Sequence, residues 1–475
     1  MRAPPSTLEV VEARAWSEPQ RPALYEGGVQ LGYGQLANQL LQCAQHLRTL
    51  GVRRGERVAV AGPGFGIQIV VLLACEAIGA VTASFEAHED TDASELFKHV
   101  DWVFSALPQD VPPGVRFVRL DAALARRLAQ PFAAEMPRWE PAGFDEPQRL
   151  TRTSGSTGAS KFMLLRRQAQ ESWIHPILDV AGYDPGTRLL LLGPLVANAI
   201  YGRASDCLRE GGLVMVGEGR DIGRLQPTHV YGLPLQLELL LAQLPAGYVA
   251  PHPVKVTTMG GFAPPQLRQR ARAVFHTEPG SRYGSNEAHI ICVDLDAEGA
   301  GVLCPGVEVR ILGPGGDALP TGQPGVIAVR TPAMADGYLG RPEESAAAFR
   351  DGWFVSGDFG ALVGPRRLQL LGRTDELLNL GGVKVPTVRV EDALREQPAF
   401  QDVAVLGGSF AGGATLGIAA VLAPAAAAED VLQAVRSVFG PDAAEAVRVL
   451  RVPALPRLPS GKVDRPALLE ALRRA

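Results

Sequence analysis

Apolar residues recur at helical spacing in the N-terminal part of the chain. Between Leu36 and Leu50, one face of the predicted helix carries Leu36, Leu40, Cys43, Ala44 and Leu47. Gly51–Gly55 then turns the chain into a short apolar run, Arg57–Ala61, which predicts a buried strand. A glycine-rich turn, a helix and a second short strand follow it. This order predicts a βαβ layer covered by helices.

The same alternation continues through the middle of the chain. Apolar runs at Leu189–Leu192 and Leu213–Val216 predict strands, and segments such as Leu235–Leu244 predict helices between them. Strands that alternate with helices are typical of parallel sheets covered by helices.

The pattern changes after Val302. Short runs such as Val307–Ile311 and Gly325–Arg330 lie between Gly/Pro turns, as in a small β-barrel or meander. The last hundred or so residues have strands of their own at Val403–Leu406 and Gly417–Leu422, which predict a small α+β domain.

These patterns predict an α/β fold with two domains. A large N-terminal domain of helix-covered sheets spans residues 1–373 and includes a small β-barrel subdomain at about 302–372. It is hinged to a small α+β C-terminal domain at 374–475. Gly364-Pro365 and Gly372–Gly382 are interpreted as the hinge region.

Composition narrows the class of protein. Of the 475 residues, 46% are hydrophobic and 20% charged, with a formal net charge of −4, so neither nucleic acid nor an anionic membrane is expected as a partner. The most apolar run, Ile67–Val81, is too short to span a bilayer and contains Glu76. No signal-type apolar stretch follows the N-terminus, and five scattered cysteines without a C-x-x-C pair favour a reducing cytoplasm.

Candidate chemistry is concentrated in the segment Thr153–Lys161. Its hydroxyl groups, two glycines and lysine can direct donors and a cation toward one point, as a phosphate chain requires. The predicted phosphate ligands are Thr153, Ser154, Gly155, Ser156, Thr157, Gly158 and Lys161. A Walker A loop is excluded because Ser160 and Phe162 flank the lysine. A solvated Ser/Gly linker stays open as the alternative.

A second glycine-rich turn, Gly62–Gly66, is followed by Glu86 and imitates a dinucleotide-binding unit. Its spacing is G-x-G-x-G, and Pro63 occupies the turn. We therefore favour a structural βαβ layer, with a nucleotide-binding dehydrogenase as a distant alternative.

Further polar clusters follow along the chain. Each has a simple structural explanation taken alone: a helix cap, a turn residue or a solvated charge. These clusters are Tyr283-Gly284-Ser285-Asn286-Glu287, Val355-Ser356-Gly357-Asp358, Gly372-Arg373-Thr374-Asp375 and Pro456–Lys462.

In this order, the motifs resemble those of the acyl-adenylate-forming superfamily, which includes acyl-CoA synthetases, adenylation domains and firefly-type luciferases. The resemblance covers nearly the whole chain, with Met334–Tyr338, Phe349–Trp353 and Glu391 as further matching positions. It implies an AMP-forming acid–thiol ligase. A carboxylate attacks the α-phosphate of ATP, pyrophosphate leaves, and a thiol then displaces AMP.

The resemblance also implies roles for individual residues. Thr153–Lys161 would hold the β- and γ-phosphates, and Asn286 and Glu287 would lie at the α-phosphate, with Glu287 binding Mg²⁺. Lys462, Glu287 and Asn286 would be the catalytic residues, with Lys462 bridging the acid and the α-phosphate. Asp375 would be the hinge about which the C-terminal domain rotates. The adenosine would be held by Tyr283, Gly284, Gly261, Ala263, Asp358 and Arg373.

The chain departs from the family pattern at three places. The phosphate segment ends Gly158-Ala159-Ser160-Lys161, one cation short of the usual form. Asn286 replaces a threonine, and Pro194–Asn198 lacks the usual histidine. A non-catalytic relative is disfavoured, because Glu287, Asp358 and Lys462 are all retained.

The acid is predicted from the pocket positions. By resemblance, Asn198 falls at the position where an asparagine of the aryl-acid branch contacts a ring hydroxyl of the substrate. This position favours a small aromatic acid such as a hydroxybenzoate. An aliphatic acid, and transfer to an amine instead of a thiol, stay open. The acceptor thiol is CoA or an acyl carrier protein. The predicted pocket walls are Asn198, Tyr201, Tyr231, Gly232, Met259, Gly260 and Ser285.

Overall fold

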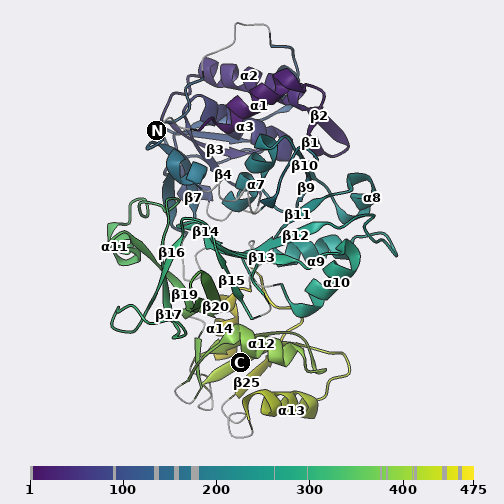
Figure 1. Cartoon of the computed structure of the whole chain (residues 1–475), viewed down its shortest axis with the longest axis vertical. Helices are drawn as coiled ribbons and strands as arrows, with labels where there is room; N and C mark the ends of the chain where they lie inside the picture. Colours follow the sequence, from purple (N-terminus) through teal and green to yellow (C-terminus); the bar gives the residue numbers. More distant parts are fainter. Residues whose placement is uncertain are drawn as a thin grey trace. The chain divides into compact units, whose positions relative to one another are not determined.

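The computed structural model divides the chain into two compact units. The first is formed by Met1–Glu308 and Val329–Phe354, the second by Val309–Ala328 and Val355–Ala475 (Figure 1). The structure describes residues 4–88, 93–132, 139–153, 160–172, 181–261, 263–296, 298–374, 377–380, 383–408, 410, 415–440, 447–457 and 463–474. Each unit is described by itself below.

The first unit contains a six-stranded sheet in the order β6-β5-β3-β4-β7-β8. Four of these strands, β6, β5, β3 and β4, are parallel neighbours, β7 is parallel to β4, and β8 is antiparallel to β7. The strands are β3 (Arg57–Ala61), β4 (Val81–Ser84), β5 (Trp102–Ser105), β6 (Arg116–Arg119), β7 (Pro147–Arg152) and β8 (Phe162–Arg166). The strand predicted at Arg57–Ala61 is confirmed.

Helices of the first unit pack on one another beside this sheet. They include α1 (Thr7–Ser17), α2 (Tyr33–Leu50), α3 (Phe65–Ala77), α4 (Ala93–Phe97) and α5 (Ala122–Leu128). The predicted apolar face of α2 is buried, with Leu36, Leu40 and Leu47 at most 1% exposed. Gly51 ends α2 in a left-handed conformation at φ 88°, which a residue with a Cβ atom adopts only with strain.

A second run of strands in the first unit has the order β15-β14-β13-β12-β11-β9-β10-β1-β2. The six strands from β13 to β1 are parallel neighbours. The strands are β1 (Pro22–Glu26), β2 (Val29–Gly32), β9 (Arg188–Leu191), β10 (Leu213–Val216), β11 (His229–Gly232), β12 (Lys255–Met259), β13 (Gly280–Ser285), β14 (His289–Val293) and β15 (Ala300–Leu303).

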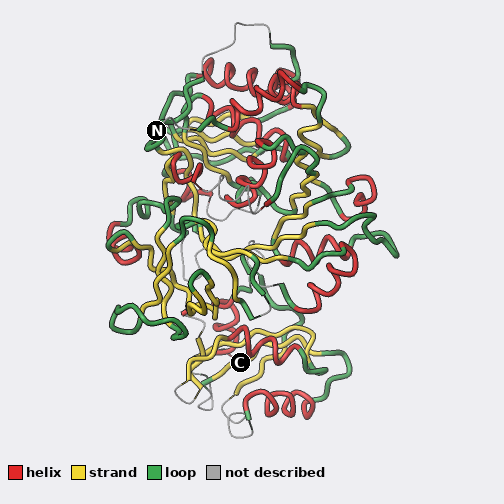
Figure 2. The backbone as a smooth tube through the Cα atoms, in the orientation of Figure 1, coloured by secondary structure: helices red, strands yellow, loops and turns green. Residues whose placement is uncertain are grey.

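Most connections between these strands are helical. In Figure 2 the helices are red and the strands are yellow. They include α7 (Asn198–Arg209), α8 (Ile222–Leu225), α9 (Pro234–Ala242) and α10 (Pro265–Phe275). This is the predicted alternation. A further short helix, α11 (Pro342–Ala348), precedes β18 (Phe349–Arg350).

The second unit is richer in strands. The strands β16 (Glu308–Leu312), β17 (Gly325–Arg330), β19 (Trp353–Gly364) and β20 (Arg367–Arg373) are consecutive neighbours. Gly364 and Pro365 lie at the turn between β19 and β20.

The C-terminal part of this unit has a sheet of its own in the order β23-β24-β25, with a two-stranded pair, β21-β22. Its elements are β21 (Leu377–Leu380), β22 (Val383–Pro386), α12 (Thr387–Arg395), β23 (Phe400–Gly407), β24 (Leu416–Leu422), α13 (Ala428–Phe439), β25 (Val447–Arg451) and α14 (Arg465–Arg474).

The predicted α/β fold class is confirmed, with a large helix-covered N-terminal part and a smaller α+β C-terminal part. The boundary at residue 373 stays a prediction, and Asp375 lies outside the described residues. Among the helices that the structure describes, none has the length and apolar character needed to cross a membrane.

Candidate active site

The predicted site residues of the first unit gather because their strands are parallel neighbours. β9, β11, β12 and β13 end at Leu191, Gly232, Met259 and Ser285. The carboxyl ends of adjacent parallel strands meet at one edge of a sheet, where open α/β sheets bind their ligands. Strand ends as far apart in sequence as Leu191 and Ser285 therefore meet at one edge.

The turn between β13 and β14 presents Asn286 and Glu287. Only glycine fits at position 284, because a Cβ atom there would fall on the carbonyl oxygen of His289. The Oγ of Ser285 accepts a hydrogen bond from the backbone N–H of Ala288 at 3.2 Å, which closes the turn. Asn286 donates from Nδ2 to the carbonyl oxygen of Arg152 at 2.6 Å and so ties this turn to the end of β7.

Glu287 is buried and held at one carboxylate oxygen. Its side chain accepts at Oε1 a hydrogen bond of 3.0 Å from the Tyr338 hydroxyl, and its carbonyl oxygen accepts from the N–H of Ala335 at 2.8 Å. Burial and the nearby Glu287 carboxylate raise the pKa of Tyr338, so the phenol keeps its proton and acts as the donor. A buried carboxylate with one oxygen fixed fits Mg²⁺, which is bound through one or two carboxylates together with substrate phosphates.

The two ends of the predicted phosphate segment lie side by side. The N–H of Thr153 donates to the carbonyl oxygen of Lys161 at 2.8 Å, which continues the β7–β8 pairing. Lys161 Nζ lies 2.8 Å from Glu344 Oε2 and 4.7 Å above the ring of Tyr338. A lysine at this place can reach an anion close to Glu287. Ser154, Gly155, Ser156, Thr157 and Gly158 lie outside the described residues.

The predicted adenine and pocket walls lie at the ends of β11, β12 and β13. The hydroxyl of Tyr231 donates to Met259 Sδ at 3.3 Å, and Tyr283 is 8% exposed. Gly232, Gly260 and Gly261 follow at the strand ends, and a Cβ atom at Gly260 would lie 2.9 Å from Leu233 Cδ2. Ala263 packs into the core beside α9 and α10.

Asn198 and Tyr201 lie in a buried polar network at the start of α7. Asn198 Oδ1 accepts a hydrogen bond from Arg149 Nε at 2.8 Å. Because arginine only donates, this contact fixes the orientation of the amide. Asn198 Nδ2 is buried and has no hydrogen-bond partner among the described residues. The Tyr201 hydroxyl donates to Glu76 Oε1 at 2.6 Å, and its ring lies 3.9 Å from Arg149 Cζ.

Sequence reasoning missed Arg149 and Glu76. Glu76 also accepts hydrogen bonds from Thr82 Oγ1 and Gln148 Nε2, at 3.1 and 3.0 Å. Burial raises the pKa of Glu76, an effect that Tyr201 and Arg149 oppose. An acidic residue inside the apolar run Ile67–Val81 is the signal that could have found this network, because such a residue is rarely buried without partners.

In the second unit, Asp358 and Arg373 face each other across β19 and β20. They are paired residues in the ladder, and Arg373 NH1 lies 3.7 Å from Asp358 Oδ1. A Cβ atom at Gly357 would lie 2.6 Å from Arg373 NH2, so a side chain there would displace the guanidinium group. Asp375 and Lys462 lie outside the described residues, and their roles stay predictions.

The fold and this edge of the sheet define an acyl-adenylate-forming enzyme, an AMP-forming acid–thiol ligase. The AMP-binding enzyme family model matches residues 11–339, and the model of the AMP-binding enzyme C-terminal domain matches residues 389–462. The chain therefore belongs to the AMP-binding enzyme family.

Curated relatives and solved structures agree with this placement. The chain is 30% identical over 430 residues to a feruloyl-CoA synthase from Amycolatopsis sp, which covers 83% of this chain and 84% of that protein. It is 26% identical over 445 residues to indoleacetate–CoA ligase from Aromatoleum aromaticum, covering 84% of each. The ATP-bound structure of MatB from Rhodopseudomonas palustris has the same fold, with a TM-score of 0.83, 23% identity and 98% of each chain covered.

Proposed function

We propose that this enzyme activates a small aromatic acid with ATP and transfers the acyl group to the thiol of CoA. The observation that carries the proposal is the buried Asn198, whose amide is oriented by Arg149 with Nδ2 left to donate. A ring substituent that accepts a hydrogen bond, such as the hydroxyl of a hydroxybenzoate, complements this group. The names of the two relatives, a feruloyl-CoA and an indoleacetate–CoA ligase, support an aromatic acid and CoA.

In the first half-reaction, the acid carboxylate attacks the α-phosphorus of ATP and the bond to the β-phosphate breaks, so pyrophosphate leaves. The residues Thr153–Lys161 hold the leaving pyrophosphate, and Lys462 bridges the carboxylate and the α-phosphate. Glu287 would hold Mg²⁺, whose charge would neutralise phosphate charge. Asp358 accepts hydrogen bonds from the ribose hydroxyls, with Arg373 beside it.

In the second half-reaction, the thiol sulfur attacks the acyl carbon, the thiol proton is lost and AMP leaves. Rotation of the C-terminal part about Asp375 would exchange the two arrangements. An acyl carrier protein presents the same phosphopantetheine thiol and is the alternative acceptor. The five cysteines, an odd and scattered set of buried side chains, support a cytoplasmic location.

The test is acid-dependent exchange of labelled pyrophosphate into ATP over a panel of 2-hydroxybenzoate, 4-hydroxybenzoate, benzoate, phenylacetate, ferulate, hexanoate and phenylalanine. Hydroxybenzoates should be fastest, and benzoate should be slower by about tenfold, the effect of one hydrogen bond in a buried site. Fastest exchange with hexanoate or phenylalanine would reject the aromatic acid. Thioester formation with CoA and with a carrier protein then decides the acceptor.

Lys462→Ala should lower the exchange rate by about 10²–10³-fold, as expected for one preorganised electrostatic contact. The matched control is Arg457→Ala, a nearby cation that pairs with Asp402 at 3.0 Å. Exchange at the wild-type rate in Lys462→Ala would remove that lysine from the mechanism.

A further inference from the structure

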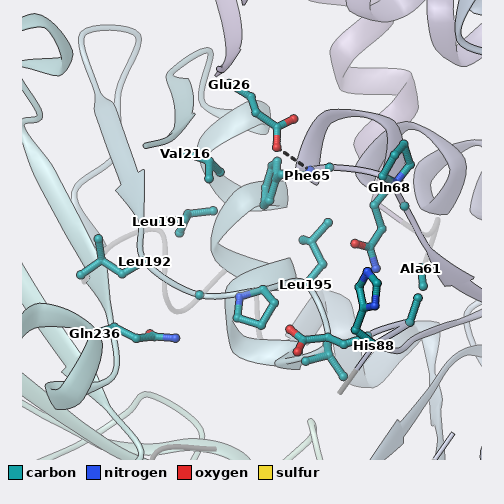
Figure 3. A pocket seen from close by; sticks show the side chains of 18 of the residues that line it. Glu26, Ala61, Phe65, Gln68, His88, Leu191, Leu192, Leu195, Val216 and Gln236 are labelled. Atoms are coloured by element: carbon teal, nitrogen blue, oxygen red, sulfur yellow. Dashed lines mark hydrogen bonds between the residues drawn. The ribbon is translucent and has the colours of Figure 1, made fainter. Parts of the chain in front are cut away.

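The first unit contains a cavity of about 750 Å³ that none of the predicted site residues lines. It opens where β1, β3, β9 and β10 end, and helix α9 closes one side. Its volume is in the range of small-molecule sites, about 300–1,000 Å³. Figure 3 shows Val216, Leu191 and Leu195 around this space, with Phe65 and Glu26 beside them.

The glycine-rich turn Gly62–Gly66 and Glu86 belong to this cavity and not to the predicted ATP site. Gly62, Gly64 and Glu86 all line it, in the order that a dinucleotide-binding unit requires. In such a unit the first N–H groups of the helix hold a pyrophosphate. Here, however, the Glu26 side chain accepts hydrogen bonds from Phe65 N at 2.7 Å and Gly66 N at 2.8 Å.

Glu26 therefore occupies the anion position at the N-terminus of α3. A Cβ atom at Gly64 would lie 2.9 Å from Glu26 Oε1, so the glycine makes room for this carboxylate. A phosphate or carboxylate ligand would find these donors occupied and would meet a like charge. This arrangement explains why the turn imitates a dinucleotide site without being one.

Two further carboxylates, Glu86 and Glu218, also line the cavity, together with the imidazole of His88. None of its described lining residues is lysine or arginine, but Glu218 pairs with Arg220 at 2.6 Å. Gln68 Nε2 donates to the carbonyl oxygen of Val60 at 2.9 Å, and Gln236 Oε1 accepts from Leu233 N at 2.8 Å, so both amides are fixed. The remaining walls are mainly apolar side chains of Phe65, Phe85, Leu191, Leu192, Leu195 and Val216.

We propose that this cavity binds a small apolar cation, an aryl- or alkylammonium, at a site separate from the acid and ATP sites. The apolar walls bury the hydrocarbon part, and the carboxylates of Glu26 and Glu86 attract the ammonium group. This binding does not depend on the proposed reaction.

The probes are 2-phenylethylammonium, the neutral 2-phenylethanol and the anionic phenylacetate, titrated by calorimetry without ATP. Phenylacetate can also enter the acid pocket. Only binding that Val216→Trp removes is therefore counted, because the larger indole takes up space at the apolar wall where the hydrocarbon part of the ligand would lie. We expect the ammonium to bind at least tenfold more tightly than the alcohol, and phenylacetate to show no such component. Equal binding of all three, or preference for the anion, overturns the proposal.

A second variant tests the charge of the cavity without changing its volume. Glu86→Gln should weaken binding of the ammonium by about three- to tenfold and leave binding of the alcohol unchanged. Glu238→Gln is the matched control on α9, because Glu238 faces Arg270 at 3.9 Å and does not line the cavity. If Val216→Trp does not fold, hydrogen exchange of the wild type replaces it. Binding of the ammonium should then slow amide hydrogen exchange mainly at residues 61–66 and 191–196. If exchange slows only in other parts of the chain, the site is rejected.

Discussion

At the residue scale, the held carboxylate of Glu287 is the feature that the sequence could not reveal. The motif Tyr283–Glu287 predicted the acid, but its partner, Tyr338, comes 51 residues later and contacts it only in the folded chain. Tyr338 also lies beneath Lys161 and is fixed by the hydrogen bond from its N–H to Ser345 Oγ at 2.8 Å. It thus positions the carboxylate that is predicted to bind Mg²⁺.

Tyr338→Phe should raise the Mg²⁺ concentration needed for half-maximal pyrophosphate exchange by about tenfold, because groups that orient a metal ligand affect metal affinity by about 10–100-fold. The ring and its contact with Phe349, at 5.5 Å between centroids, are retained. The thermal midpoint and the KM for the acid should therefore change little. An unchanged Mg²⁺ dependence would show that Tyr338 is only a packing residue.

The sequence also predicted Asn198 as a pocket residue without any indication of which way its amide faces. That orientation depends on Arg149, 49 positions earlier, and so follows from tertiary structure alone. Motif residues are predictable because a local pattern defines them. The side chains that orient them are distant in sequence and follow no such pattern.

At the element scale, strand runs and their order were predictable because burial on both faces makes parallel strands almost continuously apolar. β3, β9 and β10 agree with the predicted runs to within one residue at each end. The glycine-rich turn before α3 was not interpretable in this way. Its glycines imitated a dinucleotide-binding turn, whereas its spacing favoured a structural layer. The group that satisfies the helix is Glu26 at the end of β1.

The start of β11 carries a histidine that should make the first unit sensitive to acid. Burial lowers the pKa of His229 to about 4 from its usual 6.5, and the nearby Lys255 adds to this effect. Below pH 6.5 the unfolded chain binds a proton that the folded chain binds only near pH 4, so stability falls as the pH falls through this window.

Between pH 7 and pH 5 the free energy of unfolding of the wild type should therefore fall by about 1–2 kcal/mol more than that of His229→Gln. Urea unfolding followed by tryptophan fluorescence at both pH values measures the difference. Some acid sensitivity should persist, because burial also lowers the pKa of His289, to about 3. Parallel pH curves for the two proteins would mean that His229 is not the group responsible.

At the scale of the whole molecule, one segment of the first unit connects the two proposed ligand sites. Leu195 and Val196 line the cavity, and they lie in the segment Pro194–Asn198 that leads to the predicted acid pocket. The carbonyl oxygen of Leu195 accepts a hydrogen bond from Arg149 NH2 at 3.3 Å, and Arg149 Nε donates to Asn198. A ligand that shifts Leu195 therefore acts on the amide that is proposed to recognise the acid.

Saturating 2-phenylethylammonium should consequently change the acid concentration for half-maximal pyrophosphate exchange by about fivefold or more, the lower end of typical coupling between sites. Val216→Trp should abolish this change, because the indole obstructs the apolar wall of the cavity. Arg149→Met should abolish it while the ammonium still binds, because the connection to Asn198 is cut. Coupling is reciprocal, so a non-reactive analogue of the acid must change the affinity for the ammonium by the same factor. An effect that survives in Val216→Trp would arise elsewhere and would separate the cavity from acid recognition.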